Sequence, residues 1–272
     1  MTLSRRKFIK TAFFASAGLA IADAFWIEKF FIESNEFYMG RATKKTTNLK
    51  VVQLSDLHLH SINYQLIQLT KKLNKLKPDL ILITGDSLDN AKNIPLLNDF
   101  LKLIDHSIKK VAILGNREHD AKVNLIELEQ VYNDNNADLL INQSQKYTFP
   151  NKTISITGVD DYVRNKADFS KAIKEYKPSD HHIILNHCPE YSDDISKIMN
   201  KDLPVDFILS GHTHGGQINV LGYCPFLPAG SGQYLNGWYK NRTPQLYVSK
   251  GIGTSNLPIR FGARAEMAIF HL

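Results

Sequence analysis

The sequence predicts a layered α/β fold, and three observations carry that prediction. The chain has 272 residues, of which 43% are hydrophobic, so it can bury the core of one large domain. From residue 49 onward, apolar runs of strand length alternate with stretches in which apolar residues recur at helical spacing. Three of these runs are followed by polar residues at intervals of 30 residues (86 − 56 and 116 − 86), which suits one strand–helix–strand unit.

The first part of this region predicts three buried strands, each followed by a loop. The strands are expected at 49–55, 80–84 and 110–115. Apolar residues recur at helical spacing over 62–76, and Pro78 ends that helix because proline cannot continue it. A second helix is expected around 95–104.

The later part predicts shorter strands and one long loop. Further strands are expected at 152–159, 181–187, 205–211, 245–251 and 266–272. Helices are expected at 168–176 and 193–199, and an ordered loop rich in Gly, Pro and aromatic residues at 218–244. Long loops beside a site often have a function.

The N-terminal segment differs in composition from the rest of the chain. Residues 1–10 are basic, and 11–22 form an apolar run that is shorter than the roughly 20 residues of an ordinary membrane span. The stretch SRRKFIK resembles the export signal that the twin-arginine translocase reads. We therefore expect a signal or anchor segment at 1–32, a linker at 33–48 and a domain at 49–272, with the protein exported across the cytoplasmic membrane or anchored outside it.

Charge and cysteine content argue against a nucleic-acid-binding protein and against a fold that depends on disulfides. The formal net charge is +6, but cleavage after Ala24 would remove four basic residues and one acidic residue and leave (33 − 4) − (27 − 1) = +3. So small an excess of positive charge does not indicate a nucleic-acid-binding surface, and no stable nucleic-acid partner is expected. Cys188 and Cys224 are the only cysteines, so the fold does not depend on a disulfide framework.

Residues of metal-ligand type follow the predicted strands. The fragments are SDLHLH (55–60), TGDSLD (84–89), LGNREH (114–119), LNHCPE (185–190) and SGHTHGG (210–216). Ligands of open α/β sheets bind at the carboxyl edge of the strands, so these side chains are expected to gather at one place. Two imidazoles in an i, i+2 relation, as at His212 and His214, can each reach a separate cation.

In this order, the five fragments resemble the calcineurin-like metallophosphoesterases. That pattern is Asp-x-His, Gly-Asp, Gly-Asn-His-Asp/Glu, a lone His and Gly-His-x-His, and the resemblance covers 49–272. It implies a four-layer sandwich of two mixed β-sheets flanked by α-helices. It also implies that one metal ion is held by Asp56, His58, Asp86 and His214, and a second by Asp86, Asn116, His187 and His212.

The resemblance further implies hydrolysis of a phosphate ester. Two divalent metal ions bridged by Asp86 would hold a hydroxide that attacks phosphorus, and both ions would neutralise the developing charge. A ligand set of imidazole, carboxylate and one amide suits Mn, Fe, Zn or similar ions better than calcium.

One position departs from the family pattern. Arg117 stands where a histidine usually follows the Asn ligand. Arginine cannot give up its proton, so Arg117 can clamp phosphate oxygens but cannot act as a general acid. His119, two residues later, is the candidate for that role; alternatively, Arg117 and Glu118 are a solvated loop pair.

The C-terminal stretch 247–266 resembles a signature of one exported branch of this superfamily. That branch includes bacterial phosphodiesterases and UDP-2,3-diacylglucosamine pyrophosphatases. In it, Arg260 or Arg264 would meet an anionic substrate, although a structural ion pair explains either arginine equally well.

The predicted function is therefore hydrolysis of a phosphodiester or pyrophosphate bond. The aromatic loop and the N-terminal segment favour a lipid-linked substrate and a membrane surface as partner, with the translocase as a second partner. The alternatives are a nucleotide or nucleic-acid phosphodiesterase, or a non-catalytic metal-binding interaction protein on the same fold.

Overall fold

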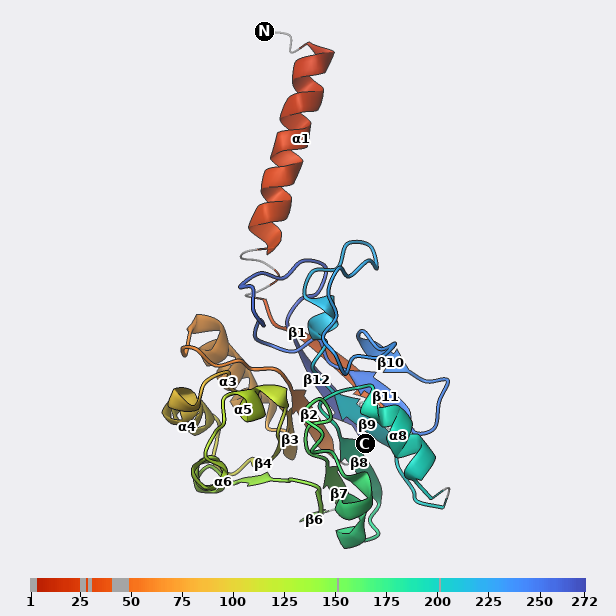
Figure 1. Cartoon of the computed structure of the whole chain (residues 1–272). Helices are drawn as coiled ribbons and strands as arrows, with labels where there is room; N and C mark the ends of the chain where they lie inside the picture. The colour runs from red at the N-terminus through yellow and green to blue at the C-terminus, as the bar shows by residue number, and fades with distance from the viewer. Residues whose placement is uncertain (1–3, 25–27, 29–30, 41–48, 151, 201) are drawn as a thin grey trace.

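Two six-stranded β-sheets form the body of the protein. The computed structural model describes residues 4–24, 28, 31–40, 49–150, 152–200 and 202–272. The sheets face one another, and helices cover their outer sides (Figure 1). The predicted sandwich of two mixed sheets flanked by helices is confirmed.

The first sheet has the strand order β1-β12-β2-β3-β4-β5. Its strands are β1 (Glu33–Tyr38), β2 (Lys50–Leu54), β3 (Leu80–Thr84), β4 (Lys109–Ile113), β5 (Ala137–Leu139) and β12 (Glu266–His271). Strands β2 to β5 are parallel, while β12 pairs antiparallel with β2. The loops that follow β2, β3 and β4 therefore leave from one edge of the sheet.

The second sheet has the order β10-β11-β9-β8-β7-β6. Its strands are β6 (Gln143–Phe149), β7 (Lys152–Gly158), β8 (His181–Leu185), β9 (Phe207–Ser210), β10 (Gly237–Tyr239) and β11 (Gln245–Val248). The four inner strands are parallel, and β6 and β10 close the two edges antiparallel. The predicted loop 218–244 thus contains one short strand, β10.

Helices pack on both sheets because each inner strand is apolar on both faces. The helices are α3 (Tyr64–Leu76), α4 (Ile94–Lys102) and α6 (Leu125–Asp134) over the first sheet, with α7 (Phe169–Ala172) and α8 (Tyr191–Ile198) over the second. In β3, Ile81 and Ile83 pack under the helices, while Leu80 and Leu82 pack between the sheets. This alternation produces the four layers.

The segment predicted as a linker contains a strand. Residues 33–38 form β1, which pairs parallel with β12 at the edge of the first sheet. Apolar patterning gives no sign of it because the strand ESNEFY is only partly buried. The sheet therefore begins at Glu33, while residues 41–48 lie outside the described part of the chain.

An N-terminal helix, α1 (Arg5–Ala22), projects from one end of the body (Figure 1). Within the residues that the structure describes, no helix combines the length and the apolar character needed to cross a membrane. The contacts at its base connect it to the domain, because the carbonyl of Ala24 accepts a hydrogen bond from the backbone N–H of Arg260 at 3.0 Å.

Candidate metal centre

The ligand-type residues lie where the carboxyl ends of the two sheets meet. Asp56 follows β2, Asp86 follows β3, and Asn116 begins the short helix α5 (Asn116–Asp120) after β4. His187 and His212 follow β8 and β9 of the second sheet. All of these elements are parallel within their sheets, so the topology alone brings the five loops together.

Asp56, His58 and His214 form the first group of side chains. His214 Nε2 lies 3.4 Å from Asp56 Oδ1 and 3.0 Å from His58 Nε2. All three side chains are buried, and their ligand atoms are close enough to share one cation. Carboxylate oxygen and imidazole nitrogen suit a transition metal.

His187, His212 and Asn116 form the second group. His212 Nδ1 lies 3.2 Å from His187 Nε2, while Asn116 lines the same cavity as His212. The carboxylate of Asp86 lies between the two groups, since its Oδ1 is 3.4 Å from His187 Nε2 and its Oδ2 is 3.8 Å from His58 Nε2. The seven residues predicted as ligands are therefore brought together around Asp86.

Outer hydrogen bonds orient three of these imidazoles. His58 Nδ1 lies 2.7 Å from Asp89 Oδ1, His187 Nδ1 lies 2.8 Å from the carbonyl of Thr84, and His212 Nε2 lies 2.7 Å from the carbonyl of Ala229. Because a carbonyl or carboxylate can only accept, each of these nitrogens donates its proton. The other nitrogen of each ring faces the cluster, and in the neutral ring its lone pair is available for a ligand bond.

The backbone at the ligands is held in an uncommon conformation. Asp56, His58, Asp86, His212 and His214 all have positive φ, between 43° and 73°. Non-glycine residues rarely adopt this left-handed region, and such strain gathers at functional sites. Backbone hydrogen bonds hold the turns, because Asp56 N–H donates to the carbonyl of Gly85 at 3.1 Å and His58 N–H to that of Asp86 at 3.0 Å.

Glu118 organises the loop that carries Asp86. Its buried carboxylate accepts hydrogen bonds from the backbone N–H groups of Asp86, Ser87, Leu88 and Gly115, at 2.6 to 3.3 Å. Burial and the nearby Asp86 carboxylate raise the pKa of Glu118 to about 7. The alternative of a solvated Arg117–Glu118 pair is wrong for Glu118, which is 2% exposed.

The electrostatics of the site favour positive charge. Burial opposes a proton on His187, but the Asp86 carboxylate outweighs it and raises the pKa of His187 to about 10. Burial likewise opposes a proton on His58, and the hydrogen bond to Asp89 and the charge of Asp86 raise its pKa. By contrast, burial and the neighbouring His58 hold the pKa of His214 well below its usual range, so this ring is neutral.

These residues fit a bound cation. The carboxylates that favour a proton on His58 and His187 equally favour a metal ion among the same nitrogens. Among the described residues, none donates a hydrogen bond to the buried Oδ1 of Asn116. A buried amide oxygen without a partner is costly, and a metal ion would satisfy it.

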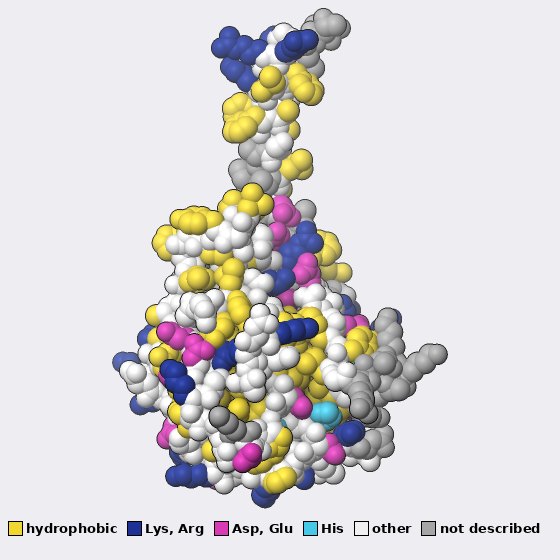
Figure 2. Space-filling view, turned by 90° about the vertical axis from the view of Figure 1, so that its right-hand side faces the viewer, with side chains coloured by type: hydrophobic (Ala, Val, Ile, Leu, Met, Phe, Trp, Pro, Cys, Tyr) yellow, Lys and Arg dark blue, Asp and Glu magenta, His cyan; other side chains and the backbone are white. Residues whose placement is uncertain are grey.

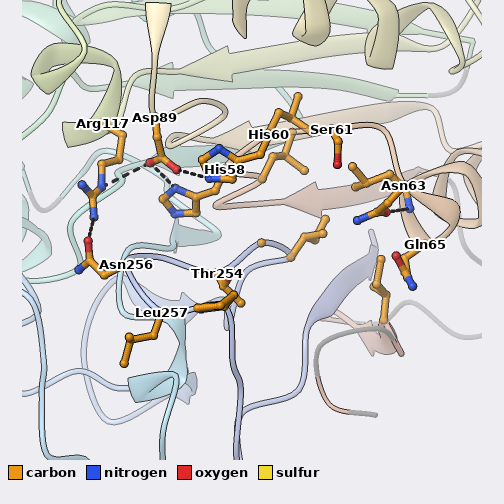
Figure 3. A pocket seen from close by; sticks show the side chains of 17 residues that line it. His58, His60, Ser61, Asn63, Gln65, Asp89, Arg117, Thr254, Asn256 and Leu257 are labelled. Atoms are coloured by element: carbon orange, nitrogen blue, oxygen red, sulfur yellow. Dashed lines mark hydrogen bonds and ion pairs between the residues drawn. The ribbon is translucent and has the colours of Figure 1, made fainter. Parts of the chain in front are cut away.

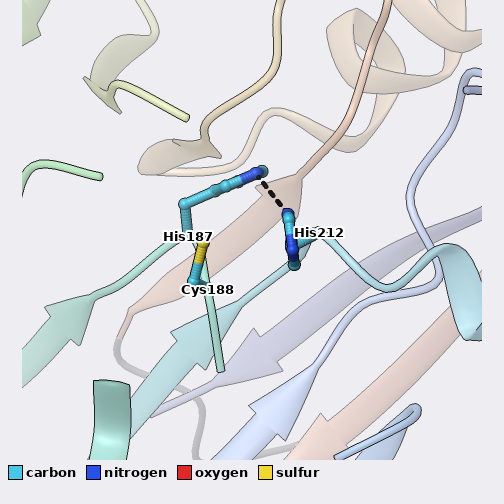
Figure 4. A group of neighbouring side chains, drawn as sticks. All are labelled: His187, Cys188 and His212. Atoms are coloured by element: carbon cyan, nitrogen blue, oxygen red, sulfur yellow. Dashed lines mark hydrogen bonds between the residues drawn. The ribbon is translucent and has the colours of Figure 1, made fainter. Parts of the chain in front are cut away.

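Cys188 lies beside the second group without being a good ligand. Its Sγ is near the ring nitrogens of His187 and His212 (Figure 4). However, the thiol donates to Asp161 Oδ1 at 3.2 Å, and burial raises its pKa well above the usual range. A metal ligand must be the thiolate, which this environment disfavours. Both cysteines are free, so they form no disulfide.

Arg117 stands between two cavities beside the cluster. The smaller cavity, of about 270 Å³, is lined by polar residues that include Asp86, Asn116 and His214 and by apolar residues of the 218–228 loop. The larger, of about 570 Å³, is lined by His58, Asp89 and residues of the 252–258 loop (Figure 3). Arg117 lines both.

Hydrogen bonds hold Arg117 across the gap between these cavities. Its Nη2 donates to Ser255 Oγ at 2.6 Å and to Asn256 Oδ1 at 3.0 Å. Its Nε is 3.5 Å from Asp89 Oδ1 (Figure 3). A guanidinium is thus positioned at the mouth of the site.

The other predicted catalytic and substrate-binding residues lie elsewhere. His119 Nε2 is 2.6 Å from Asp160 Oδ1, and His119 is not among the described residues that line either cavity. Arg260 is fully buried and donates to the carbonyls of Gly253 and Ala263, with its Nη2 3.3 Å from His214 Nδ1. It packs behind a ligand and is not open to substrate.

Arg264 contacts β1 and is not among the described residues that line either cavity. Its Nη1 is 3.7 Å from Glu33 Oε1 on β1, and its side chain is 46% exposed. The alternative of a structural ion pair therefore describes Arg264, whereas Arg260 is held by hydrogen bonds to backbone carbonyls.

Sequence reasoning missed two residues that support the centre. Asp89 contacts His58, His60 and Arg117, and Glu118 holds the Asp86 loop. Both lie inside the motif fragments, Asp89 as the last residue of TGDSLD and Glu118 in LGNREH. The signal that could have found them is an acidic residue a few positions from a predicted ligand in the sequence. Metal-bound imidazoles usually donate to a carboxylate or carbonyl, so such a residue is a candidate partner.

Comparison with known proteins identifies the class. The calcineurin-like phosphoesterase family matches residues 49–216, which is more than half of the chain, and the chain belongs to this family.

Several bacterial relatives are similar over most of their length. The metallophosphoesterase YkuE of Bacillus subtilis is 29% identical, over 99% of this chain and 98% of its own. YpbG of the same organism is 30% identical, over 82% and 81%. The phosphodiesterase YaeI of Escherichia coli is 27% identical, over 99% of each chain.

Replacing Glu118 by glutamine tests its role in holding the Asp86 loop. An amide would turn its NH₂ group toward backbone N–H donors, so Glu118→Gln is expected to lower the free energy of unfolding by about 2–3 kcal/mol. Urea denaturation followed by circular dichroism measures the change. Glu129→Gln, at an exposed position on α6, is the control. An unchanged midpoint for Glu118→Gln contradicts the role.

Proposed function

We propose that this protein hydrolyses a phosphodiester or pyrophosphate bond at a centre of two divalent metal ions. The observation that carries the proposal is the position of the Asp86 carboxylate, whose Oδ1 lies 3.4 Å from His187 Nε2 and whose Oδ2 lies 3.8 Å from His58 Nε2. A shared carboxylate between two imidazole groups is what a dinuclear centre requires.

The residues divide between the two ions according to the two groups. Asp56, His58 and His214 would hold one ion, Asn116, His187 and His212 the other, and Asp86 both. Such ions supply a water-derived nucleophile at neutral pH and neutralise charge on the phosphoryl oxygens.

The protein's own groups bind and orient the phosphate. Arg117 presents a permanently charged guanidinium at the mouth, where it can donate two hydrogen bonds to phosphate oxygens in exchange for those to Ser255 and Asn256. His119 is turned toward Asp160 and supplies no proton at the cavity. This arrangement favours a leaving group that needs little protonation, such as a second phosphate.

The shape of the smaller cavity supports a substrate with an apolar part. Besides the polar ligands, it is lined by Ile218, Pro225, Phe226, Leu227 and Leu257. Apolar lining with a few fixed polar groups is typical of sites for amphipathic ligands. We therefore favour a lipid-linked phosphate ester, and the diesterase name of the Escherichia coli relative supports ester hydrolysis.

The N-terminal segment supports a place outside the cytoplasm. SRRKFIK is similar to a twin-arginine signal and lies at the start of α1. We propose export through the twin-arginine translocase, with α1 as signal or anchor.

Metal-dependent turnover and its loss in Asp86→Asn test the proposed reaction. With Mn²⁺, the purified protein is expected to cleave bis-p-nitrophenyl phosphate, and Asp86→Asn to lower turnover by about a hundredfold or more because a neutral amide bridges two cations poorly. Asp99→Asn, exposed on α4, is the matched control. Absence of turnover with any metal across lipid-linked and nucleotide esters would favour a non-catalytic protein.

A second pair of variants separates Arg117 from His119. Arg117→Gln removes the cation at the mouth and is expected to raise KM by about tenfold, the effect of one lost charge-assisted contact. His119→Gln is expected to leave kcat and KM within about twofold, because that ring contacts Asp160 outside the cavities. Steady-state kinetics measure both, and loss of kcat in His119→Gln alone would restore the histidine as the acid.

A further inference from the structure

An exposed apolar loop follows the turn that carries His212 and His214. We define the apolar loop as residues 218–228. Its exposed side chains are Val220 (47%), Leu221 (104%), Tyr223 (72%), Phe226 (82%) and Leu227 (43%). Scattered exposed apolar residues are normal, but a contiguous group marks an interaction surface.

The tip of the apolar loop holds its most exposed residue in place. Val220 and Tyr223 exchange backbone hydrogen bonds of 2.9 and 3.0 Å, which closes a two-residue turn. Leu221 and Gly222 occupy this turn with φ of 53° and 94°. Such turns favour Asn or Gly, and a leucine here costs both strain and exposure to water. The part of this cost that comes from exposure to water is recovered if the side chain enters an apolar environment.

The sequence around the loop lacks charge altogether. No Asp, Glu, Lys or Arg lies between His214 and Lys240, although much of this stretch is at the surface. Surfaces that face only water are normally rich in charged residues. The uncharged stretch is therefore suited to an apolar phase.

The apolar loop and α1 are at the same end of the molecule (Figure 1). A chain of contacts links them: Ala24, just after α1, bonds to Arg260, and the next residue, Phe261, pairs with Gln217 and Asn219 at the base of the loop. Figure 2 shows apolar side chains gathered on the body near the base of the helix.

The side chains of α1 indicate which kind of surface this end of the molecule contacts. Phe8, Ile9, Phe13, Phe14 and Leu19 of α1 are each at least 63% exposed. Residues 1–22 contain no acidic residue but include Arg5, Arg6, Lys7 and Lys10. Apolar side chains together with unopposed basic ones are complementary to an anionic lipid surface.

We propose that the apolar loop and α1 together form a docking surface for an anionic lipid bilayer. Leu221 and Tyr223 enter the apolar boundary of the membrane. The basic residues are at the end of α1 remote from the loop, so α1 lies along the bilayer surface for them to meet the headgroups. Phe226 and Leu227 line the cavity above the metal ligands, so docking places the mouth of that cavity at the membrane. This last consequence rests on the proposed function, whereas docking itself does not.

Vesicle binding by the full chain tests the surface. The parent is expected to sediment with vesicles of equal parts phosphatidylglycerol and phosphatidylcholine and more weakly with phosphatidylcholine alone. The double variant Leu221→Ser, Tyr223→Ser is expected to bind about tenfold more weakly, because two apolar side chains no longer enter the bilayer. Ile126→Ser, at an exposed position on α6, is the control. Equal binding by double variant and parent would overturn the proposal.

A fluorescence measurement separates the loop from α1. Tryptophan emission added by Leu221→Trp is expected to shift to shorter wavelength with vesicles and to be quenched by brominated phosphatidylcholine, while that added by Ile126→Trp is not. Absence of quenching for Leu221→Trp on vesicle-bound protein would overturn a role for the loop.

The results of the vesicle-binding and quenching experiments do not depend on whether the protein is an enzyme. Leu221 and Tyr223 are not among the described residues that line the cavity, so turnover of a soluble ester is expected to be the same in the double variant and the parent. Quenching without any turnover leaves the docking surface standing and removes the proposed function. Turnover without quenching leaves the proposed function standing and removes the docking surface.

Discussion

The buried carboxylate of Asp86 is the group on which the rest of the site depends. It lies within 4 Å of two imidazoles and is almost inaccessible to solvent. A buried charge is stable only when paired and hydrogen-bonded. Here the backbone N–H of Arg117 donates to its Oδ1 at 2.8 Å, and the imidazoles provide the positive charge. The need to balance this carboxylate explains the raised pKa of His187 and favours a cation at the same place.

The two sheets supply different kinds of side chain to the site. The first supplies both aspartates, the amide and His58, whereas the second supplies His187, His212 and His214. The Asp86 carboxylate of the first sheet is therefore balanced in part by His187 of the second. Packing of the sheets, through the apolar core between them, is therefore also what completes the site. The positive φ at five ligands shows that the fold holds backbone strain to reach this geometry.

The parts of the fold that the sequence could predict are those with strong apolar patterns. Strands such as β3, with the sequence LILIT, are buried on both faces, so their unbroken apolar runs predict them directly. Strands β1, β5, β6 and β10 were missed because they are short or only partly buried, so their pairing is decided by neighbours distant in the chain. Helices α5 and α6 were missed for a related reason, since α6 buries only Leu128 and Tyr132.

The same distinction holds at the site. The predicted ligand residues could be placed because each lies within four residues of the end of a strand, so the sheet largely fixes its position. The directions of His119 and Arg260 could not, because they depend on partners such as Asp160 and the carbonyl of Gly253 that no local pattern reveals. Diffraction from crystals grown with Mn²⁺, measured at an energy where manganese scatters anomalously, tests the centre most directly. We expect two anomalous peaks, one on each side of the Asp86 carboxylate; a single peak away from Asp86, or none, would contradict a shared dinuclear site.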